Sequence, residues 1–418
     1  MSKLIPNGLL AVVVSSSLLL AQGDKPATAA GWSAKPGSGL SYDGGDAFGL
    51  KWSNRLQVHW TFSNIENAAD TNTFNIRRAR TNLTGHVFNK NVMYALILDG
   101  TDSGDEGDGN IKQAWGQWNF SKSEDSAVGL RVGQAKTMFG LEATTSSAGL
   151  WFVERSSASR AFADSYSRGA WINGGLMMKD RPLRFAIGAM NTDAANGLGA
   201  GYTDRGEEAA NSDNELSYVL AANIDPMGDF GNGKQTLESN RQGDWRTDNN
   251  DLKGTIGVGI ALGNGVDTAT GSDVESTSIN LNTAWTVNRF NIMGEYFMRT
   301  DDLQGATQDE EEPTGFAISL GYLLEKSGDS AIQWGLGIRF NMIETDEGTV
   351  GSGVDYLTGA QGIGGTDGEA SEISFVANAF YHGHQCKTQI EYTLQDVEPT
   401  GTGGTTNHIL RVGFQLEF

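Results

Sequence analysis

The chain ends in the stretch His408-Ile409-Leu410-Arg411-Val412-Gly413-Phe414-Gln415-Leu416-Glu417-Phe418. Every second residue from His408 onward is largely apolar, whereas the residues between them include Arg411, Gln415 and Glu417. Because successive side chains of a β-strand point to opposite faces, one face of this strand suits lipid and the other suits water. A single strand of a soluble sandwich has the same alternation, so the rest of the chain must decide between these two fold classes.

The same alternation recurs along the chain from about residue 47. Gly, Ser, Thr, Gln, Asn and Arg mostly separate the apolar positions, and polar-in, apolar-out alternation over many strands predicts a transmembrane barrel with a wet interior. An aromatic residue at the outward position 418 fits that class and predicts an assembly signal for outer-membrane insertion. The clearest apolar series are Leu56, Val58, Trp60 and Phe62; Ile256, Val258, Ile260 and Leu262; Phe316, Ile318, Leu320 and Tyr322; and Ile332, Trp334, Leu336, Ile338 and Phe340.

Sixteen stretches have this strand pattern, and the even number suits a closed antiparallel barrel. The fold class is therefore all-β, a transmembrane antiparallel β-barrel of about 16 strands, wide enough for an aqueous channel. The predicted strands are 47–63, 72–88, 91–100, 110–121, 126–135, 168–178, 183–191, 214–225, 251–262, 275–286, 287–299, 314–324, 331–343, 371–383, 385–394 and 406–418.

The connections alternate between long and short, as outer-membrane barrels require. Because a wide barrel is usually narrowed by a loop folded into the pore, 136–167 is the expected constriction loop. The connection 226–250 should be a short turn and is not, which indicates an insertion or a missed hairpin. The predicted external loops are 64–71, 101–109, 136–167, 192–213, 263–274, 300–313, 344–370 and 395–405.

The start of the sequence indicates export. Lys3, a weakly apolar run over 9–21 and the small residues at 27–29 predict a signal peptide over 1–29, although a disordered or buried segment remains an alternative. We assign 30–46 to an N-terminal periplasmic segment and 47–418 to the outer-membrane barrel, a multi-pass β-barrel in the bacterial outer membrane. Cys386 is the single cysteine, so no intramolecular disulfide can form.

Composition and motifs exclude several function classes. The net charge of −21 makes nucleic acid an unsuitable partner, and the scattered histidines show no metal-ligand spacing, so we expect no cofactor and no metal site. A barrel enzyme would need an outward Ser, His and carboxylate, but no nucleophile motif is present, and we expect no catalytic residues. A soluble exported sandwich or adhesive surface protein is the other alternative; it would leave the aromatic at 418 unexplained.

Strand parity predicts a basic pore wall, because lipid-facing charges cost about 2–4 kcal/mol at the membrane midplane. Such a wall would favour anions, although inward arginines could instead pair with loop carboxylates and hold the constriction in place. Only Glu295, Glu391 and Glu417 share the inward parity as acids. The inward cations are Arg55, Arg78, Arg80, Arg131, Arg184, Arg289, Arg299, Arg339, Lys387 and Arg411.

Arg78 and Arg80 share one face of their strand and could pass an anion between them, since a guanidinium offers a planar donor fork. Arg77 has the opposite parity and is expected at the membrane rim. Acidic loops, including Asp99, Asp102 and Glu106, are interpreted as solvated faces that could bind divalent cations. Because of these acidic loops, a general or weakly cation-selective channel, with the loops controlling selectivity, remains the alternative.

Several motifs resemble the phosphate-selective porin O/P family: Arg77-Arg78-Ala79-Arg80, Arg131 to Lys136, Phe139-Gly140-Leu141-Glu142, Thr145-Ser146-Ser147 and Glu154-Arg155-Ser156. The resemblance covers about residues 74–418 and implies a sixteen-stranded porin, usually a homotrimer in lipid and lipopolysaccharide, with passive uptake of phosphate, polyphosphate or other small anions. The expected anion-binding residues are Arg78, Arg80, Arg131, Lys136, Arg155, Arg184, Arg299, Arg339 and Lys387. The expected constriction-loop residues are Glu142, Glu154 and Arg160.

Overall fold

The computed structural model describes most of the chain beyond residue 30. The signal peptide predicted at 1–29 lies outside the described residues. The described ranges are 31–66, 68–100, 110–123, 126–163, 166–191, 216–230, 237–238, 250–266, 273–303, 312–326, 331–345, 368–399 and 403–418.

Strands β3 to β18 form a closed antiparallel barrel in which each strand pairs with the next along the chain. The barrel closes where β18 pairs with β3, from Asn407 opposite Ile65 to Glu417 opposite Arg55. All sixteen predicted strands are confirmed, with ends shifted by a few residues. The strands are β3 (Phe48–Ile65), β4 (Thr71–Val87), β5 (Val92–Asp99), β6 (Asn110–Lys122), β7 (Ser126–Lys136), β8 (Tyr166–Met178), β9 (Arg181–Met190), β10 (Ser217–Ile224), β11 (Lys253–Val266), β12 (Asp273–Val287), β13 (Phe290–Leu303), β14 (Thr314–Leu323), β15 (Gln333–Glu344), β16 (Gly368–His382), β17 (Cys386–Pro399) and β18 (Thr405–Glu417).

A short hairpin precedes the barrel. Strands β1 (Gly31–Lys35) and β2 (Gly39–Asp43) pair with each other, and β2 also pairs with the start of β3, from Leu40 opposite Trp52 to Asp43 opposite Gly49. Because β18 reaches only to Arg55 on β3, the hairpin continues the sheet beyond the end of β18. The sequence analysis assigned no strands to this segment.

The outward and inward faces of the strands follow the predicted parity. On β11 the outward Ile256, Val258, Ile260 and Leu262 are 37–47% exposed, which provides an apolar surface for lipid. Inward positions are buried and largely polar, such as Asn280 and Asn282 on β12. In the described part of the chain, no helix is long and apolar enough to cross a membrane.

The two ends of the barrel differ in their connections. We call the end where β3 begins and β18 finishes the terminus end, and the opposite end the loop end. Turns at the terminus end are short except for 225–252, which joins β10 to β11. The loop end carries the 137–165 connection between β7 and β8, and its described part, 137–163, is named here the inner segment.

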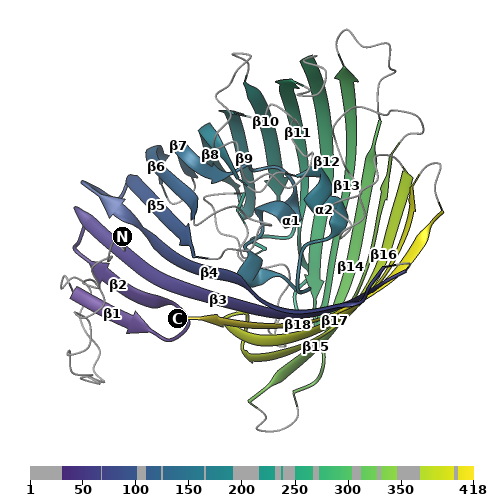
Figure 1. The fold of residues 1–418 in the computed structure, drawn as a ribbon. Helices are drawn as coiled ribbons and strands as arrows, with labels where there is room; N and C mark the ends of the chain where they lie inside the picture. Colours follow the sequence, from purple (N-terminus) through teal and green to yellow (C-terminus); the bar gives the residue numbers. More distant parts are fainter. Residues whose placement is uncertain are drawn as a thin grey trace, which may run out of the picture.

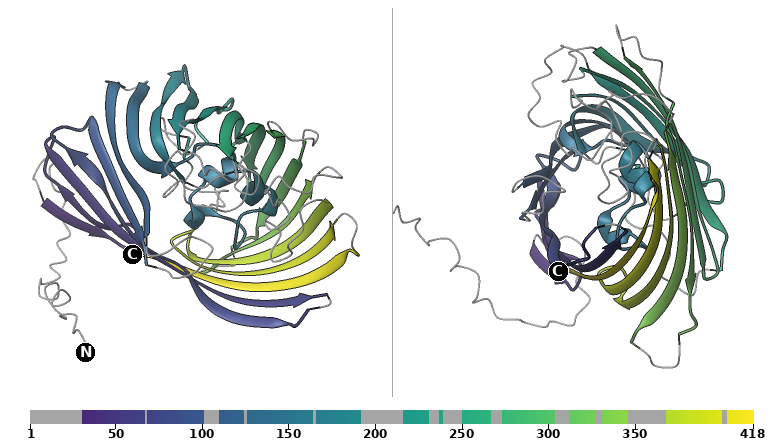
Figure 2. Two further views of the ribbon diagram at one scale, coloured as in Figure 1. Left: turned by 45° about the horizontal axis from the view of Figure 1, so that its top comes forward. Right: turned by 45° about the vertical axis from the view of Figure 1, so that its right-hand side comes forward.

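The inner segment lies inside the ring of strands. It contains α1 (Leu141–Thr144), the 3-10 turn η1 (Ser147–Gly149) and α2 (Ser157–Phe162), and both α1 and α2 appear within the barrel in Figure 1 and in the right-hand view of Figure 2. Almost every residue of this segment is buried. The predicted infolding of 136–167 is therefore seen in the arrangement of the described residues.

Candidate functional site

Local sequence bends the inner segment into compact turns. Met138 and Gly140 both have positive φ, 65° and 77°, which turn the chain sharply after β7. Ser146 and Ser156 then accept hydrogen bonds at the starts of η1 and α2, from the backbone N–H groups of Ala148 and Ser159. These caps satisfy backbone donors that would otherwise be buried without partners.

Aromatic side chains fix one side of the inner segment to the wall. Phe162 stacks on Phe297 of β13 with ring centroids 5.5 Å apart, and Phe139 lies 6.2 Å from the same ring. A Cβ atom built on Gly315 would approach Phe162 to 2.6 Å, and one built on Gly259 would approach Phe139 to 2.9 Å. The inward glycines therefore form sockets for the aromatic rings.

Trp151 fills a second socket of the same kind. A Cβ atom on Gly321 or Gly337 would lie 2.6 Å from its indole ring, and Phe380 packs on it at 5.6 Å. These inward glycines had been interpreted as lining a wet pore. That interpretation was wrong for this part of the wall, because the small residues admit buried rings of the inner segment.

Charged groups of the inner segment first hold the segment to itself. Glu142 accepts hydrogen bonds from the backbone N–H and hydroxyl of Ser156, at 2.9 and 2.6 Å. Arg155 donates to the carbonyl oxygens of Glu142 and Thr145, at 2.9 and 2.7 Å. Two predicted site residues, Glu142 and Arg155, thus link the two helices.

The wall strands next to the inner segment also bind its backbone. Lys136 at the end of β7 donates to the carbonyl oxygens of Ala143, Thr144 and Thr145, at 3.1, 2.6 and 2.9 Å. Across the barrel, Glu295 accepts from the backbone N–H groups of Leu141 and Glu142, at 2.6 and 3.0 Å. Lys136 therefore fixes the carbonyl end of α1, while Glu295 fixes its N–H end.

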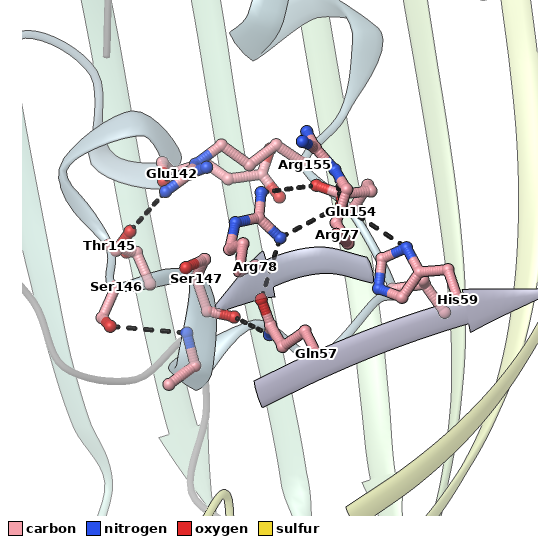
Figure 3. A network of polar contacts seen from close by, with 12 residues as sticks. Gln57, His59, Arg77, Arg78, Glu142, Thr145, Ser146, Ser147, Glu154 and Arg155 are labelled. Carbon is pink, nitrogen blue, oxygen red and sulfur yellow. Dashed lines mark hydrogen bonds and ion pairs between the residues drawn. The ribbon is translucent and has the colours of Figure 1, made fainter. Parts of the chain in front are cut away.

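Glu154 is the centre of the polar network shown in Figure 3. Arg78 donates to both of its oxygens, at 3.1 and 3.0 Å, and the Nε of Arg77 donates at 2.7 Å. Arg78 also donates to Gln57 at 3.0 Å. Burial would raise the pKa of Glu154, but Arg77 and Arg78 hold that pKa well below its usual range.

Arg77 was predicted at the membrane rim, and that prediction was wrong. Gln57 pairs with Arg78 but Val58 pairs with Ile76, so β4 has a bulge at Arg77. A bulge lets two successive side chains leave the usual alternation. Arg77 and Arg78 are both buried and both contact Glu154.

Arg80 binds a carboxylate of the neighbouring strand. Its Nε donates to Asp99 at 2.6 Å, and its NH1 lies 3.3 Å from the Tyr166 hydroxyl and 3.5 Å from that of Ser147. Asp99 is the last residue of β5 and is buried. Its interpretation as part of a solvated loop was therefore wrong, while Asp102 and Glu106 lie outside the described residues.

Cations and acids of strands β15, β17 and β18 bind the middle of the inner segment. Arg339 donates to the carbonyl oxygen of Glu154 at 2.8 Å and lies 3.6 Å from the carboxylate of Glu142. Lys387 donates to the carbonyl oxygen of Leu150. Glu391 accepts from the backbone N–H of Val153 and from Arg411, at 2.8 and 2.9 Å.

The remaining predicted residues lie on β9, in α2, on β13 and in a turn. Arg184 on β9 pairs with Asp225 at the start of the β10–β11 connection. Arg299 is buried on β13, and Arg160 is partly buried in α2. Arg289 was placed on the pore wall, but it lies in the turn between β12 and β13 and contacts the exposed Glu325 at 3.4 Å.

Three cavities border strands β3 to β7. The central cavity, about 420 Å³, lies against the inner segment and is lined by Arg55, Arg80 and Lys136 among others. The terminal cavity, about 610 Å³, lies nearer the terminus end and is lined by Lys90, Lys122 and Arg131. The loop-end cavity, about 220 Å³, is lined by Thr61, Thr73, Asn75, Arg77 and Arg411.

The central and terminal cavities share a border that sequence reasoning missed. Lys51, Thr84, Trp115 and Glu238 line both of them. Lys51 shares the inward parity of Arg55 within the predicted strand 47–63, so the strand pattern could have found it. Glu238 belongs to the long connection that the strand pattern could not explain.

Comparison with known proteins gives a family match by sequence. The sequence model of the family described as phosphate-selective porin O and P matches residues 53–328. This range includes β4, β7 and the whole inner segment. No curated protein sequence matches significantly.

Solved structures match in fold. The outer membrane channel DcaP of Acinetobacter baumannii is 10% identical with a TM-score of 0.57, over 89% of this chain and 98% of that chain. The anion-selective porin from Comamonas acidovorans is 10% identical with a TM-score of 0.55, over 89% and 100%. The trimer form of OmpT from Vibrio cholerae is 11% identical with a TM-score of 0.50, over 88% and 100%. At these identities the likeness shows the barrel fold alone.

Proposed function

Since the chain belongs to the phosphate-selective porin O and P family of bacterial outer-membrane channels, we propose that it passes small anions in preference to cations. The channel is passive: solutes diffuse down their gradients through the cavities beside the inner segment. Phosphate and polyphosphate are the proposed solutes of this class.

The observation that carries this proposal is the charge of the cavity walls. The central cavity is lined by four cations and two carboxylates, Lys51, Arg55, Arg80 and Lys136 against Glu238 and Glu417. The terminal cavity has the same balance, Lys51, Lys90, Lys122 and Arg131 against Asp43 and Glu238. A positive excess in a narrow, low-dielectric passage raises the local concentration of anions.

The cations of the wall differ in whether they line a cavity, and only those that do would meet a solute. Arg78, Arg184 and Arg339 contact carboxylates and line neither the central nor the terminal cavity, so their proposed role is to position the inner segment and the connections. Arg80, Arg131 and Lys136 border cavities, and we propose them as groups along the anion path. The forked guanidinium of Arg80 suits the oxygens of phosphate.

The outward face supports a proposed assembly in the membrane. The exposed side chains of β11 and β14, including Ile256, Ile318 and Leu320, suit lipid tails or a neighbouring barrel. We propose a homotrimer embedded in lipid and lipopolysaccharide; the trimer form of OmpT shows that a related barrel fold can assemble this way. Chemical cross-linking of the protein in native outer membranes would give a trimer band, whereas only monomer would contradict this assembly.

The zero-current potential of single channels under a KCl gradient tests the anion preference. An anion-selective potential, with current reduced by added inorganic phosphate, is expected from the positive cavities. A cation-selective potential would contradict the proposal and favour a general channel governed by its acidic loops. An anion-selective potential with no effect of phosphate would retain anion preference and reject phosphate as a preferred solute.

A further inference from the structure

The long connection between β10 and β11 begins at the terminus end, and the structure describes its residues 225–230, 237–238 and 250–252. At its start, Arg184 donates to Asp225 at 2.8 Å, and the backbone N–H of Phe230 donates to Asp225 at 2.7 Å. Phe230 then packs in a buried cluster with Leu141 of α1. The base of the connection is thus attached both to the wall and to the inner segment.

Leu237 is the next described residue of this connection, and it is buried inside the barrel. It is buried in the same apolar cluster as Met138, Phe139 and Phe297, the cluster that docks the inner segment. A leucine in that position fixes the backbone of the residue that follows it. The sequence analysis found no role for this connection, because its composition gave no strand pattern.

Glu238 follows Leu237 and faces the charged wall. Its Oε1 lies 3.5 Å from NH1 of Arg131, whose guanidinium sits 4.0 Å above the Trp115 ring and donates to Gln117 at 2.9 Å. The Arg131 side chain is 5% exposed, whereas Glu238 is 22% exposed. The arginine is fixed by its neighbours, and the carboxylate remains accessible to solute.

We propose that Glu238 is a selectivity-determining residue of this channel, a negative charge delivered from the terminus end to the border between the central and terminal cavities. Together with Lys51, Thr84 and Trp115 it lines both cavities. A solute that passes from one cavity to the other meets this carboxylate. Glu238 therefore limits the anion preference that the surrounding cations produce. This inference rests on the proposed function only in that the cavities conduct ions.

The direction of the effect follows from charge alone. One carboxylate within a few ångströms of a path lowers the local anion concentration and raises that of cations. Its removal leaves the cations of both cavities in place. Replacing Glu238 should therefore move selectivity toward anions whatever the selectivity of the unmodified channel is.

The test compares Glu238→Gln with the unmodified channel by zero-current potential under a KCl gradient. We expect the anion-to-cation permeability ratio to rise about three- to fivefold, as the loss of one nearby charge implies. Glu325→Gln is the matched control, because Glu325 lies in the β14–β15 turn at the same end and is 82% exposed. It should leave the ratio unchanged. An unchanged ratio in Glu238→Gln would overturn the inference.

A second variant keeps the charge of Glu238 but removes the apolar contact that holds this residue in place. Leu237→Ala removes the apolar anchor, so Glu238 should leave the border and the ratio should rise in the same direction. A ratio equal to that of the unmodified channel would overturn the anchoring by Leu237. If the unmodified channel proves cation-selective but Glu238→Gln still shifts toward anions, the proposed anion preference fails and this inference stands.

Discussion

The two sides of the barrel hold the inner segment by different means. Strands β11 to β15, the docking wall, offer glycine sockets and Phe297 to the rings of Phe139, Trp151 and Phe162. Strands β3 to β7, the charged wall, offer arginines, glutamines and a bulge, and all three described cavities border this side. On the docking wall the rings pack closely against the inward glycines. Ion pairs spaced along the charged wall leave room between them.

This difference indicates that one wall mainly positions the inner segment, while the other borders the space through which solutes would pass. On the docking wall, rings in sockets fix the inner segment alongside the charged contacts of Glu295 and Arg339. Long cationic side chains reach across to the segment and still present charge to the cavities on either side. A change on the docking wall should therefore alter conductance, whereas a change at a cavity on the charged wall should alter selectivity.

The largest effect is expected from breaking the main link to the charged wall. In Glu154→Gln, Arg77 and Arg78 lose a buried carboxylate, which should weaken attachment of the inner segment by about 3–5 kcal/mol. Single channels should show a higher and noisier conductance. Glu344→Gln, at the exposed end of β15, is the control. Conductance and noise equal to those of the unmodified channel would show that Glu154 does not hold the segment.

A smaller effect is expected from filling a socket of the docking wall. In Gly321→Val, the new side chain meets the ring of Trp151, since a Cβ atom there already lies 2.6 Å from it. Overpacking of this kind should destabilise the docked segment by about 1–3 kcal/mol. Conductance should rise while the permeability ratio changes little. Gly294→Val is the matched control, because Gly294 lies on the adjacent strand β13 and the nearest atom to a Cβ there is 3.8 Å away. Equal conductance of the Gly321→Val and Gly294→Val channels would show that the socket for Trp151 does not hold the inner segment.

The next largest effect is expected from removing one positive charge at a cavity wall. Lys51 borders two cavities and makes no ion pair within the described part of the chain. Lys51→Gln should lower the anion-to-cation ratio about twofold and leave the noise unchanged. Lys326→Gln, in the exposed β14–β15 turn, should leave both unchanged. A rise in the ratio would contradict the assignment of Lys51 to the anion path.

The smallest effect concerns pH. The pKa of Glu154 is held below its ordinary value of 4.5, so its contribution is fully present above that value and is lost as pH falls through the lower folded-state pKa. Conductance noise should therefore stay constant from neutral pH down to about pH 4.5 and increase only in more acidic solution. Glu154→Gln should lack this acid-induced change. An increase already near neutral pH would contradict the depressed pKa.

The sequence predicted the strands well because the membrane imposes a period of two on them. In β18, for example, lipid on one side and polar contacts on the other leave alternate residues with different requirements. The same parity placed Glu295, Glu391 and Arg411 inside correctly. Each of these inferences needs only the local pattern of one strand.

Features that depend on partners far along the chain were not predicted. The bulge at Arg77 shows as a shift in the pairing with β3 and brings Arg77 to the Glu154 carboxylate, and neither partner is visible in the local pattern. Gly321 looks the same in sequence whether water or Trp151 lies against it. Leu237 and Glu238 lie in a connection with no periodicity, so only the packing of the barrel reveals their positions.

The seam between β3 and β18 has a consequence for how the barrel is made. It joins residues of the two opposite ends of the meander, whereas every other strand pairing among β3 to β18 joins strands that follow each other along the chain. Direct closure of a loop of this length would cost about 5 kcal/mol of chain entropy, and stepwise pairing of the other strands lowers this cost by bringing the two edges together. Until they meet, both edges expose unpaired backbone groups. Substitutions at this seam, such as at Val58 opposite Phe414, should therefore change the rate of biogenesis and the recovery of assembled protein, with little effect on what the finished barrel transports.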